Sequence, residues 1–505
     1  MTSSERHNPS ESTGLSATLF GALFVLLGIA AFLLLAANIN DIVSTRLEGE
    51  PFGTTLLRFL NSDGIIVPLI QIGFGIFLFR LGVNLFQRRR TAAIWARQVL
   101  LWVAIVLAAL ALQAFTTAAA NPDAPRSGAL SLVGAVIAGA GFWWLGQHLL
   151  AFEGSETLAE NDARIAWNLL IPTLAVLIVV AARPLEATFI TSLTDRRFAS
   201  AREVNFVGLD NYTQLLSVRF DALGCVRAED GTCELDASGN LVFPRPRDVL
   251  DESYLDLRYR DVTGVTLGET RILLSARDRD FVNSVGNTLY FALFSVAIEL
   301  VLGLFIAMVV NSKFAGRGIM RAAMLVPWAI PTVVSARLWE IMLRDNQSGV
   351  INHFLVNLGV LGQSQAWLAT PALQIPALIA IDVWKTTPFM ALILLAGLQA
   401  IPGDIYEAAN VDGAGRVRQF FQITIPLLRP TIAVALVFRT LDAIRVFDVF
   451  QVLLGRQQLS MATYNYEMLV NSQRLGYASA IGVVIFVIIL IFTVTYVKIL
   501  GVSAE

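Results

Sequence analysis

Charged side chains recur inside an apolar stretch near the C-terminus of this 505-residue chain. Arg439, Asp442, Arg445 and Asp448 stand three residues apart there. Ionisable side chains are costly inside a membrane, so those that occur there are functional candidates by default. If the stretch is one α-helix, a three-residue step drifts by about 60° per turn, which spreads the four side chains over one broad face. Asp442 can then pair along the helix with Arg439 or with Arg445.

Two other apolar stretches combine aromatic, hydroxyl and charged side chains. The candidates in them are Trp328, Thr332, Ser335, Asp382, Trp384, Lys385, Thr386, Thr387 and Phe389. Pro327 and Pro331 are expected to bend the first of these stretches and to free backbone groups beside a cavity. One interpretation of this mixture is direct contact with a bound small molecule.

A purely structural interpretation of the same charges is also open. In it, Asp382 pairs with Lys385 and Asp442 pairs with Arg445, and these ion pairs hold neighbouring helices in register. Glu299 is a lone acid in a further apolar stretch. We expect it to pair with a neighbouring helix rather than to contact a ligand.

Membrane-spanning helices must position these side chains. The chain is 55% hydrophobic and 15% charged, with a mean hydropathy of +0.64, whereas soluble domains carry about 25% charged residues. Apolar runs of about 20 residues recur along nearly the whole length, which indicates a polytopic membrane protein. Ten spans are expected, near residues 15–38, 63–86, 95–119, 129–151, 166–191, 286–310, 319–343, 372–399, 431–454 and 478–500. The net charge of −2 and the lack of a basic patch with interleaved aromatic residues do not favour nucleic-acid binding.

Lysines and arginines in the short loops predict the orientation of the chain. Three basic clusters follow the second, sixth and eighth spans: Arg88, Arg89, Arg90 and Arg97; Lys313, Arg317 and Arg321; Arg416, Arg418 and Arg429. They fall on one side of the membrane only if both termini are cytoplasmic, which an even number of spans permits. The long segment 192–285 then lies outside.

The two cysteines of the chain, Cys225 and Cys233, lie in this external segment, where oxidising conditions permit a disulfide. The intervening residues RAEDG favour a turn that brings the two together. The alternative is a pair of free thiols in a surface loop. The surrounding segment 213–285 contains short β-like runs and is expected to form a small cap that is partly β. The cap either contacts an extracellular partner or only shields the spans.

The 24-residue stretch EAANVDGAGRVRQFFQITIPLLRP, which begins at Glu407, is expected to form a helical hairpin on the cytoplasmic side. Asp404 and Glu407 have the spacing of a capping box for its first helix. Ala408 and Ala409 are small, so another surface can approach closely there. Gly413 can take the positive φ that ends this helix.

The second helix of the hairpin is expected to run through Phe420, Phe421 and Ile423 and to break at Pro426 and Pro430. Exposed aromatic side chains there would form an apolar patch of the kind that marks a partner site. The alternative is that the two phenylalanines pack back on the ends of the spans.

The spacing of the hairpin resembles the EAA loop of bacterial ABC importer permeases. The matching positions are Glu407, Ala408, Ala409, Gly413, Ile423, Ile425 and Pro426, and Ile425 stands where the family usually has leucine. The fuller stretch is similar to the maltose-type sugar permeases. Residues 206–216, 287–311, 321–339, 382–402 and 439–454 resemble the same family in order and spacing. The resemblance covers about residues 165–500, and the first four spans have no counterpart in the six-span core of the family.

The resemblance implies an all-α polytopic fold with about ten transmembrane helices, built on a six-helix importer core with a small external insert that is partly β. The expected parts are a cytoplasmic tail (1–14), an extra four-span region (15–160), the first core span (165–212), the extracytoplasmic insert (213–285) and the remaining core (286–505) with a coupling loop at 403–430.

The resemblance also implies a subunit of an ATP-driven importer in the bacterial cytoplasmic membrane, which forms half of an alternating-access pathway. Coupling to an ATPase is expected at Glu407, Ala408, Ala409, Asp412, Gly413, Phe420, Ile423 and Pro426. The sequence has no G-x-x-x-x-G-K-[ST] phosphate loop, so ATP and Mg²⁺ are expected on partner chains and no cofactor or enzymatic activity on this one. Expected partners are a second, smaller permease subunit, two ATPase subunits, an extracytoplasmic sugar-binding protein and membrane lipid.

In maltose-type permeases three spans line the sugar site, and they correspond to the seventh, eighth and ninth spans here. The resemblance places candidate contacts at Trp328, Thr332, Asp382, Lys385, Thr386, Phe389, Asp442 and Arg445, with Ser335 and Trp384 beside them. The expected cargo is an oligosaccharide such as maltose, maltodextrin or trehalose.

Alternatives to a sugar cargo stay open because several of these positions are charged where the family often has neutral side chains. The first alternative is an ABC permease for another polar solute, such as a glycerol phosphate or a polyol. A less favoured one is an ion-coupled secondary transporter, for which the sequence shows no convincing internal repeat. No nucleophile–base pair indicates an enzyme, and none of His7, His148 and His353 lies near a second plausible metal ligand.

Overall fold

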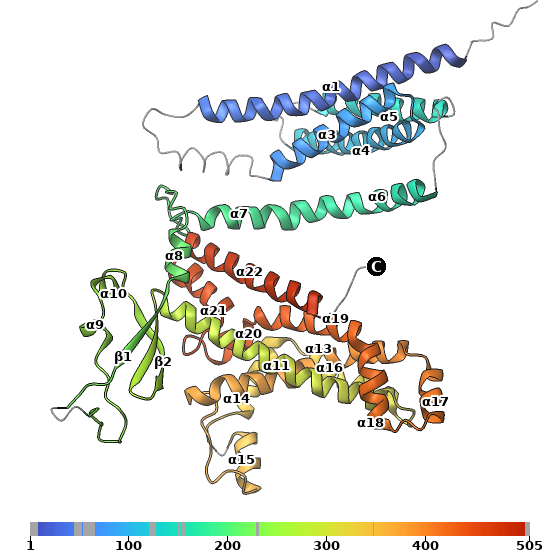
Figure 1. Cartoon of the computed structure of the whole chain (residues 1–505). Coiled ribbons are helices and arrows are strands. Elements are labelled where there is room, and N and C mark those ends of the chain that lie inside the picture. Colours follow the sequence, from blue (N-terminus) through green and yellow to red (C-terminus); the bar gives the residue numbers. More distant parts are fainter. Residues whose placement is uncertain are drawn as a thin grey trace, which may run out of the picture. The chain divides into compact units, whose positions relative to one another are not determined.

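The computed structural model describes residues 9–44, 66–120, 128–149, 158–228, 232–346 and 348–499, together with residues 53 and 152. The chain forms two compact units, Met1–Ile190 and Thr191–Glu505, each of which is described by itself (Figure 1). Eight helices among the described residues are long and apolar enough to cross a membrane, or nine if one bent pair of helices counts as a span. The expected all-α membrane architecture is therefore confirmed.

Long helices build the N-terminal unit. They are α1 (Pro9–Ser44), α3 (Ile66–Phe86), α4 (Arg90–Ala120), α5 (Gly128–His148) and α6 (Leu158–Leu177), which continues through a π turn (Ile178–Ala182) into α7 (Arg183–Ser192). α1 packs along α3, and α4 packs along α5. The continuous helix α6–α7 covers the predicted fifth span, 166–191, although it is not among the helices that pass as a span. The four spans predicted before it correspond to α1, α3, α4 and α5.

Glycines let α1 and α3 approach each other closely. A Cβ atom added to Gly82 of α3 would lie 2.7 Å from both the Gly21 carbonyl oxygen and the Val25 amide nitrogen of α1. One added to Gly28 of α1 would lie 2.8 Å from the Phe79 amide nitrogen. Helices in membranes associate through such small residues, because close backbone contact replaces the hydrophobic driving force that water supplies elsewhere.

The Gly82→Leu variant is expected to lower the stability of the N-terminal unit by about 1–3 kcal/mol, the usual cost of overpacking a closely packed site. Gly73→Leu on the same helix is the matched control, since no atom lies within 4 Å of a Cβ placed at Gly73. Thermal unfolding of the purified variants compares the two. Equal unfolding temperatures would contradict the close α1–α3 packing.

A three-stranded antiparallel sheet lies in the insert of the C-terminal unit. Its elements are α8 (Asp210–Leu216), β1 (Val218–Gly224), α9 (Pro246–Val249), α10 (Glu252–Asp256), β2 (Arg260–Leu267) and β3 (Thr270–Ala276). The strand order is β1-β3-β2, with Val218 opposite Ala276 in the first pair. The prediction of a partly β insert is confirmed.

Cys225 and Cys233 form a disulfide with their Cα atoms 5.6 Å apart. The Cys225 amide also donates to the Glu269 carbonyl, 3.0 Å away, which ties the loop to the end of the β2–β3 hairpin. Mass analysis of peptides under non-reducing conditions is expected to find the two cysteines linked. Alkylation of both thiols without a reductant would contradict the pairing.

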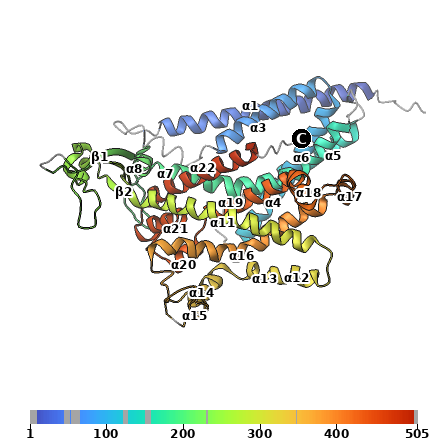
Figure 2. The ribbon, with the colours of Figure 1, turned by 60° about the horizontal axis from the view of Figure 1, so that its bottom comes forward.

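The membrane helices of the C-terminal unit surround α16. The elements are α11 (Arg279–Asn311), α12 (Arg317–Met324), α13 (Val326–Ala329), α14 (Thr332–Met342), α15 (Val350–Asn357), α16 (Pro371–Ala400), α17 (Gly403–Val411), α18 (Arg416–Gln419), a π turn (Phe420–Thr424), α19 (Ile425–Ile444), α20 (Asp448–Leu453), α21 (Met461–Tyr466), a π turn (Glu467–Asn471) and α22 (Leu475–Ile499). Figures 1 and 2 both show α11 beside α16. Their shared core includes Phe291, Leu378, Met390 and Leu394.

Asp278 joins the start of α11 to the last helices of the chain. One carboxylate oxygen accepts from the Phe281 amide and caps α11, and the other accepts from the hydroxyls of Tyr464 and Tyr477. Burial and the Asp278 carboxylate both raise the pKa of Tyr464, so its hydroxyl stays protonated and donates. This contact fixes the entry of α11 into the membrane region relative to α21 and α22.

Two predicted spans are interrupted in the structure. The seventh, predicted at 319–343, bends by 90° between α13 and α14, because Ile330 precedes a proline and adopts extended backbone angles. The ninth, predicted over 431–454, lies within Arg416–Leu453, which passes as a candidate span. It is not one continuous α-helix, because α19 ends at Ile444 and α20 begins only at Asp448. The four charges from Arg439 to Asp448 therefore do not share one helical face.

Candidate functional site

A polar cavity opens beside the break between α19 and α20. Its volume is about 170 Å³ and its lining comes from α11, α14, α16, α19 and α20. Six of the ten residues predicted for the substrate pathway line it: Thr332, Asp382, Lys385, Thr386, Asp442 and Arg445. Residues more than a hundred positions apart in the chain thus meet around one space.

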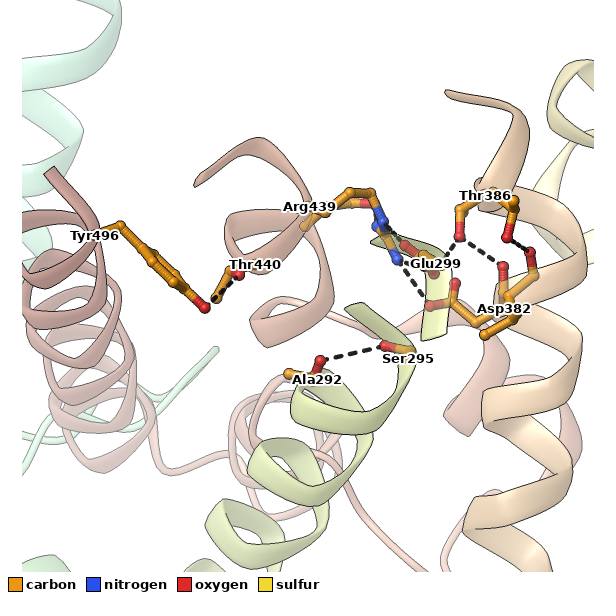
Figure 3. Close-up of polar contacts among 11 residues, drawn as sticks. Ala292, Ser295, Glu299, Asp382, Thr386, Arg439, Thr440 and Tyr496 are labelled. Carbon is orange, nitrogen blue, oxygen red and sulfur yellow. Dashed lines mark hydrogen bonds and ion pairs between the residues drawn. The ribbon is translucent and has the colours of Figure 1, made fainter. Parts of the chain in front are cut away.

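Arg439 is the centre of the charged wall of this cavity, and its side chain is only 2% exposed. Its guanidinium binds Glu299 with two hydrogen bonds, Nε to Oε2 at 2.5 Å and Nη2 to Oε1 at 2.8 Å. It also donates to Asp382 Oδ2 at 2.9 Å and to Asp442 Oδ2 at 2.6 Å. Figure 3 shows the arginine reaching from α19 toward Glu299 of α11 and Asp382 of α16. One cation therefore links three helices.

The expectation that Glu299 pairs with a neighbouring helix is confirmed. Its carboxylate also lies 2.5 Å from the Thr386 hydroxyl, which is 2.6 Å from the Asp382 carbonyl oxygen (Figure 3). A buried carboxylate needs such bonds because transfer of an unpaired charge from water is very costly. Glu299 is fully buried and holds the Arg439 guanidinium in place, whereas Asp382 and Asp442 line the cavity.

Lys385 ties α16 to the bend between α13 and α14. Its Nζ donates to the Ile330 carbonyl at 2.5 Å and lies 3.5 Å from the Trp328 carbonyl. Those two carbonyls are freed because the helix is interrupted at Pro331, as expected from the prolines. The bend therefore provides acceptors for a buried lysine.

The two ion pairs weighed from the sequence do not form among the described residues. Asp382 pairs with Arg439 in place of Lys385, and Asp442 also pairs with Arg439. Arg445, the residue after the end of α19 at Ile444, donates through Nε to the Leu441 carbonyl at 3.2 Å. Among the ion pairs considered from the sequence, the pair of Asp442 with Arg439 does form in the structure.

Four predicted pathway residues lie outside the cavity lining. The Trp328 ring stacks on Phe389 with centroids 5.8 Å apart, and Trp384 meets Trp339 edge to face at 5.5 Å. Ser335 is buried, and its hydroxyl has no hydrogen-bond partner in the described part of the chain. The aromatic candidates thus pack between helices in this conformation.

Seven further lining residues were not among the predicted pathway set. They are Phe291, Arg439, Ala443, Val446, Phe447, Asp448 and Val449. The break after Ile444 brings Phe447 and Asp448 to the cavity, and the sequence contains no proline or glycine there that could have signalled it. Arg439 was noted among the charges, but nothing local indicated its role as the centre of the network.

The predicted hairpin forms between α17 and α19. Gly413 has a φ of +73° and ends α17, as expected. The Gln419 side-chain amide donates to Asn410 Oδ1 and to the Ala414 carbonyl, both at 2.7 Å. The Tyr406 hydroxyl lies 3.0 Å from the Thr424 hydroxyl. These bonds hold the two arms of the hairpin together without help from another chain.

The predicted helix ends of the hairpin need two corrections. α17 begins at Gly403 after Pro402, and no side-chain cap is formed, so the capping box of Asp404 and Glu407 is wrong. Pro426 and Pro430 do not break the second helix, which continues through the π turn into α19. Pro426 lies in the first turn of α19, where a missing N–H costs little.

Three apolar side chains of the hairpin are strongly exposed. Val411 is 88% exposed, Val417 73% and Phe421 64%, and we call these three residues the hairpin patch. Ala409 is buried and Phe420 is half-buried with its ring edge-to-face against Phe421, 4.9 Å between centroids. Phe421 therefore fits the interpretation as part of an exposed apolar patch, whereas Phe420 is half-buried.

The sequence of the C-terminal unit matches a known protein family. Residues 299–500 match the family described as "Binding-protein-dependent transport system inner membrane component". The trehalose/maltose transport system permease protein MalF of Thermococcus litoralis is 44% identical over 251 residues, which are 48% of this chain and 83% of that protein. The trehalose transport system permease protein SugA of Mycobacterium tuberculosis is 36% identical over 246 residues, 48% of this chain and 77% of that protein.

Two further similarities extend the comparison. The sulfoquinovosyl glycerol transport system permease protein SmoG of Agrobacterium fabrum is 38% identical over 227 residues, 44% of this chain and 73% of that protein. A solved bacterial ABC transporter involved in the import of alginate has a chain that aligns with a TM-score of 0.48 at 20% identity, over 68% of this chain and 98% of that one. The chain is 44% identical to the first of these relatives over 83% of that protein's length. This multi-pass membrane protein therefore belongs to the family of binding-protein-dependent transport system inner membrane components, the permease subunits of ABC importers.

Proposed function

We propose that this permease carries a sugar through the bacterial cytoplasmic membrane, with the cavity beside Arg439 as its part of the cargo site. The observation that carries the proposal is the convergence of Asp382, Lys385, Thr386 and Asp442 on one polar cavity within an apolar helix bundle. Fixed donors and acceptors of this kind suit the hydroxyl groups of a sugar, because each hydroxyl both donates and accepts. The names of the relatives, which include trehalose and maltose, support the same class of cargo.

The cavity is too small to enclose an oligosaccharide alone. Its volume of about 170 Å³ is below the range of about 300–1,000 Å³ that is usual for ligand pockets. A second permease subunit, which we infer to be a different and smaller chain, would supply the opposite wall. On this proposal the charged residues around Arg439 orient one end of the cargo. The complete pathway forms only when this chain and the second permease subunit assemble.

A second candidate cargo is a small anionic or polyhydroxylated solute, such as a glycerol phosphate or a polyol. The observation that favours it is the presence of Lys385 and Arg445 at the cavity, since the bonds described for both go to backbone carbonyls. Each keeps a positive charge that an anionic group could complement. Uptake assays with neutral disaccharides, a sugar phosphate and a polyol separate the two candidates.

Replacing Asp442 by asparagine is expected to raise the KM for transport about tenfold while the maximal rate changes less. The reason is that a hydrogen bond to a charged group contributes about 1.5–3 kcal/mol to binding, whereas Arg439 keeps Glu299 and Asp382 as partners. Glu340→Gln is the control, because the Glu340 side chain is exposed on α14 and its ion pair among the described residues is with its helix neighbour Arg337. Equal KM values for the two variants would exclude Asp442 from the cargo site.

For the energy source, we propose that the hairpin docks on a separate ATPase subunit. Its exposed apolar patch, its internal hydrogen bonds and the EAA spacing from Glu407 support this role. The full assembly would contain two permease subunits, two ATPases that carry ATP and Mg²⁺, and an extracytoplasmic sugar-binding protein. Both termini of this chain would then lie in the cytoplasm. Co-purification of a nucleotide-binding protein with the chain tests the assembly.

A further inference from the structure

The N-terminal unit has a large apolar groove that the transport proposal does not use. The groove lies between α3, α4 and α6 and has a volume of about 570 Å³. It is lined by Phe74, Phe77, Trp95, Gln98, Val99, Trp102, Val103, Trp167 and Ile171. A mostly aromatic wall with a few polar groups is the composition of a small-molecule pocket, and the volume lies in the range that such pockets have.

The aromatic wall is organised and contains one unsatisfied donor. The Phe77 and Trp95 rings meet edge to face, with centroids 6.3 Å apart. The Trp102 indole nitrogen is buried and has no hydrogen-bond partner among the described residues. Gln98 lies one turn before Trp102 on the same face of α4. A buried donor without an acceptor is unfavourable, so an occupant with an acceptor such as an ester carbonyl would stabilise this site.

Positive charge is concentrated on α3, α4 and the turn between them. Residues 66–120 contain five arginines and no aspartate or glutamate: Arg80, Arg88, Arg89, Arg90 and Arg97. Arg80 is the one charged residue of α3, and it is exposed. It stands three residues after Phe77, on the same face of the helix and toward the end that carries Arg88–Arg90.

Arg80 needs an anion that the described protein does not supply. Among the residues that the structure describes, no hydrogen bond or ion pair involves its guanidinium. A charged side chain inside an apolar helix is costly unless it pairs or reaches the interface. Clusters of arginine next to a span attract anionic lipid headgroups. The groove, the buried indole donor and the unpaired charge therefore favour one molecule that combines a hydrocarbon chain, a hydrogen-bond acceptor and an anion.

We propose that this groove binds one anionic glycerophospholipid. An acyl chain lies in the apolar groove, an ester carbonyl accepts from the Trp102 indole, and the phosphate pairs with Arg80. A helix of another protein would fill the apolar wall, but its backbone acceptors are already used within the helix. The proposal gives the four-span region, which lies outside the family match, a lipid-binding role that is independent of the cargo.

Native mass spectrometry of the purified transport complex tests the proposal. The complex is incubated with phosphatidylglycerol or with phosphatidylcholine of the same acyl chains, and the lipid retained on this chain is counted. We expect phosphatidylglycerol to be preferred, and Arg80→Gln to weaken its retention about fivefold, the factor that one basic residue contributes near an anionic surface. Retention of phosphatidylcholine should not change.

Matched variants make the test specific. Arg183→Gln removes one positive charge at a distant position of the same unit and should keep the preference, as should Arg80→Lys. Val99→Trp fills the groove and should remove both lipids. Equal retention of the two lipids by the unaltered protein would overturn the proposal even if Arg80→Gln fails to fold. So would a preference that survives Arg80→Gln, or a polypeptide cross-linked to the groove in place of lipid.

Discussion

Replacing Arg439 by methionine is expected to lower the free energy of unfolding of the C-terminal unit by about 3–5 kcal/mol. The substitution removes every cation that the described structure places on Glu299, whose side chain is 0% exposed. It also leaves Asp382 and Asp442 as neighbouring negative charges without the guanidinium between them. Breaking one side of a buried pair is costly because the remaining charge keeps its full desolvation penalty.

Two further variants separate the network from a general effect of losing an arginine. Arg445→Met removes an exposed arginine from the same cavity and should change stability by about 0.5 kcal/mol or less. Arg439→Met combined with Glu299→Met should regain part of the loss, because the buried charges leave together. Thermal unfolding of the purified proteins measures all three. An Arg439→Met protein as stable as Arg445→Met would contradict the network.

Replacing Gly413 by proline is expected to uncouple transport from ATP hydrolysis. Proline fixes φ near −65° and cannot adopt the +73° that Gly413 has, so the turn between α17 and α18 must change and the hairpin patch must move. Residues that dominate an interface contribute about 2 kcal/mol or more each, so misplacing the patch should weaken ATPase binding at least about thirtyfold.

Gly415→Pro is the matched control for this variant. Gly415 has a φ of −66°, which proline adopts without strain. Affinity of the ATPase for the permease and the ATPase rate in proteoliposomes are the readouts. Unfolding temperatures show whether either variant acts by destabilising the permease. If both variants bind the ATPase as tightly as the unaltered chain, the hairpin is not the docking element.

Local sequence patterns predicted the elements of this protein well. Apolar runs located the helices, and the exclusive placement of Cys225 and Cys233 in a polar segment predicted their disulfide. Gly413 marked the end of α17 because few other residues take its backbone angles. The pathway candidates were chosen as polar residues in apolar stretches, and six of the ten line one cavity.

Pairing between distant helices could not be predicted in the same way. Arg439 and Glu299 are 140 residues apart. The sequence offered Arg439 the nearer Asp442, and it offered Glu299 no charged neighbour. Asp382 and Lys385 stand one turn apart, yet each bonds to a partner outside α16, because α19 and the α13–α14 bend meet α16 there. The break after Ile444 has no local signal either, since tertiary packing decides it. The aromatic candidates lie outside the cavity lining for the same reason, as Trp328 and Phe389 stack on each other.

ATP-driven uptake into proteoliposomes tests the central claim most directly. The purified chain, its partner permease, the ATPases and the sugar-binding protein are reconstituted, and accumulation of labelled trehalose and maltose is followed with and without ATP. The account predicts accumulation of at least one disaccharide that requires ATP and is lost with Gly413→Pro but not with Gly415→Pro. Uptake that proceeds without ATP, or a complete assembly that hydrolyses ATP yet moves neither sugar, would contradict it.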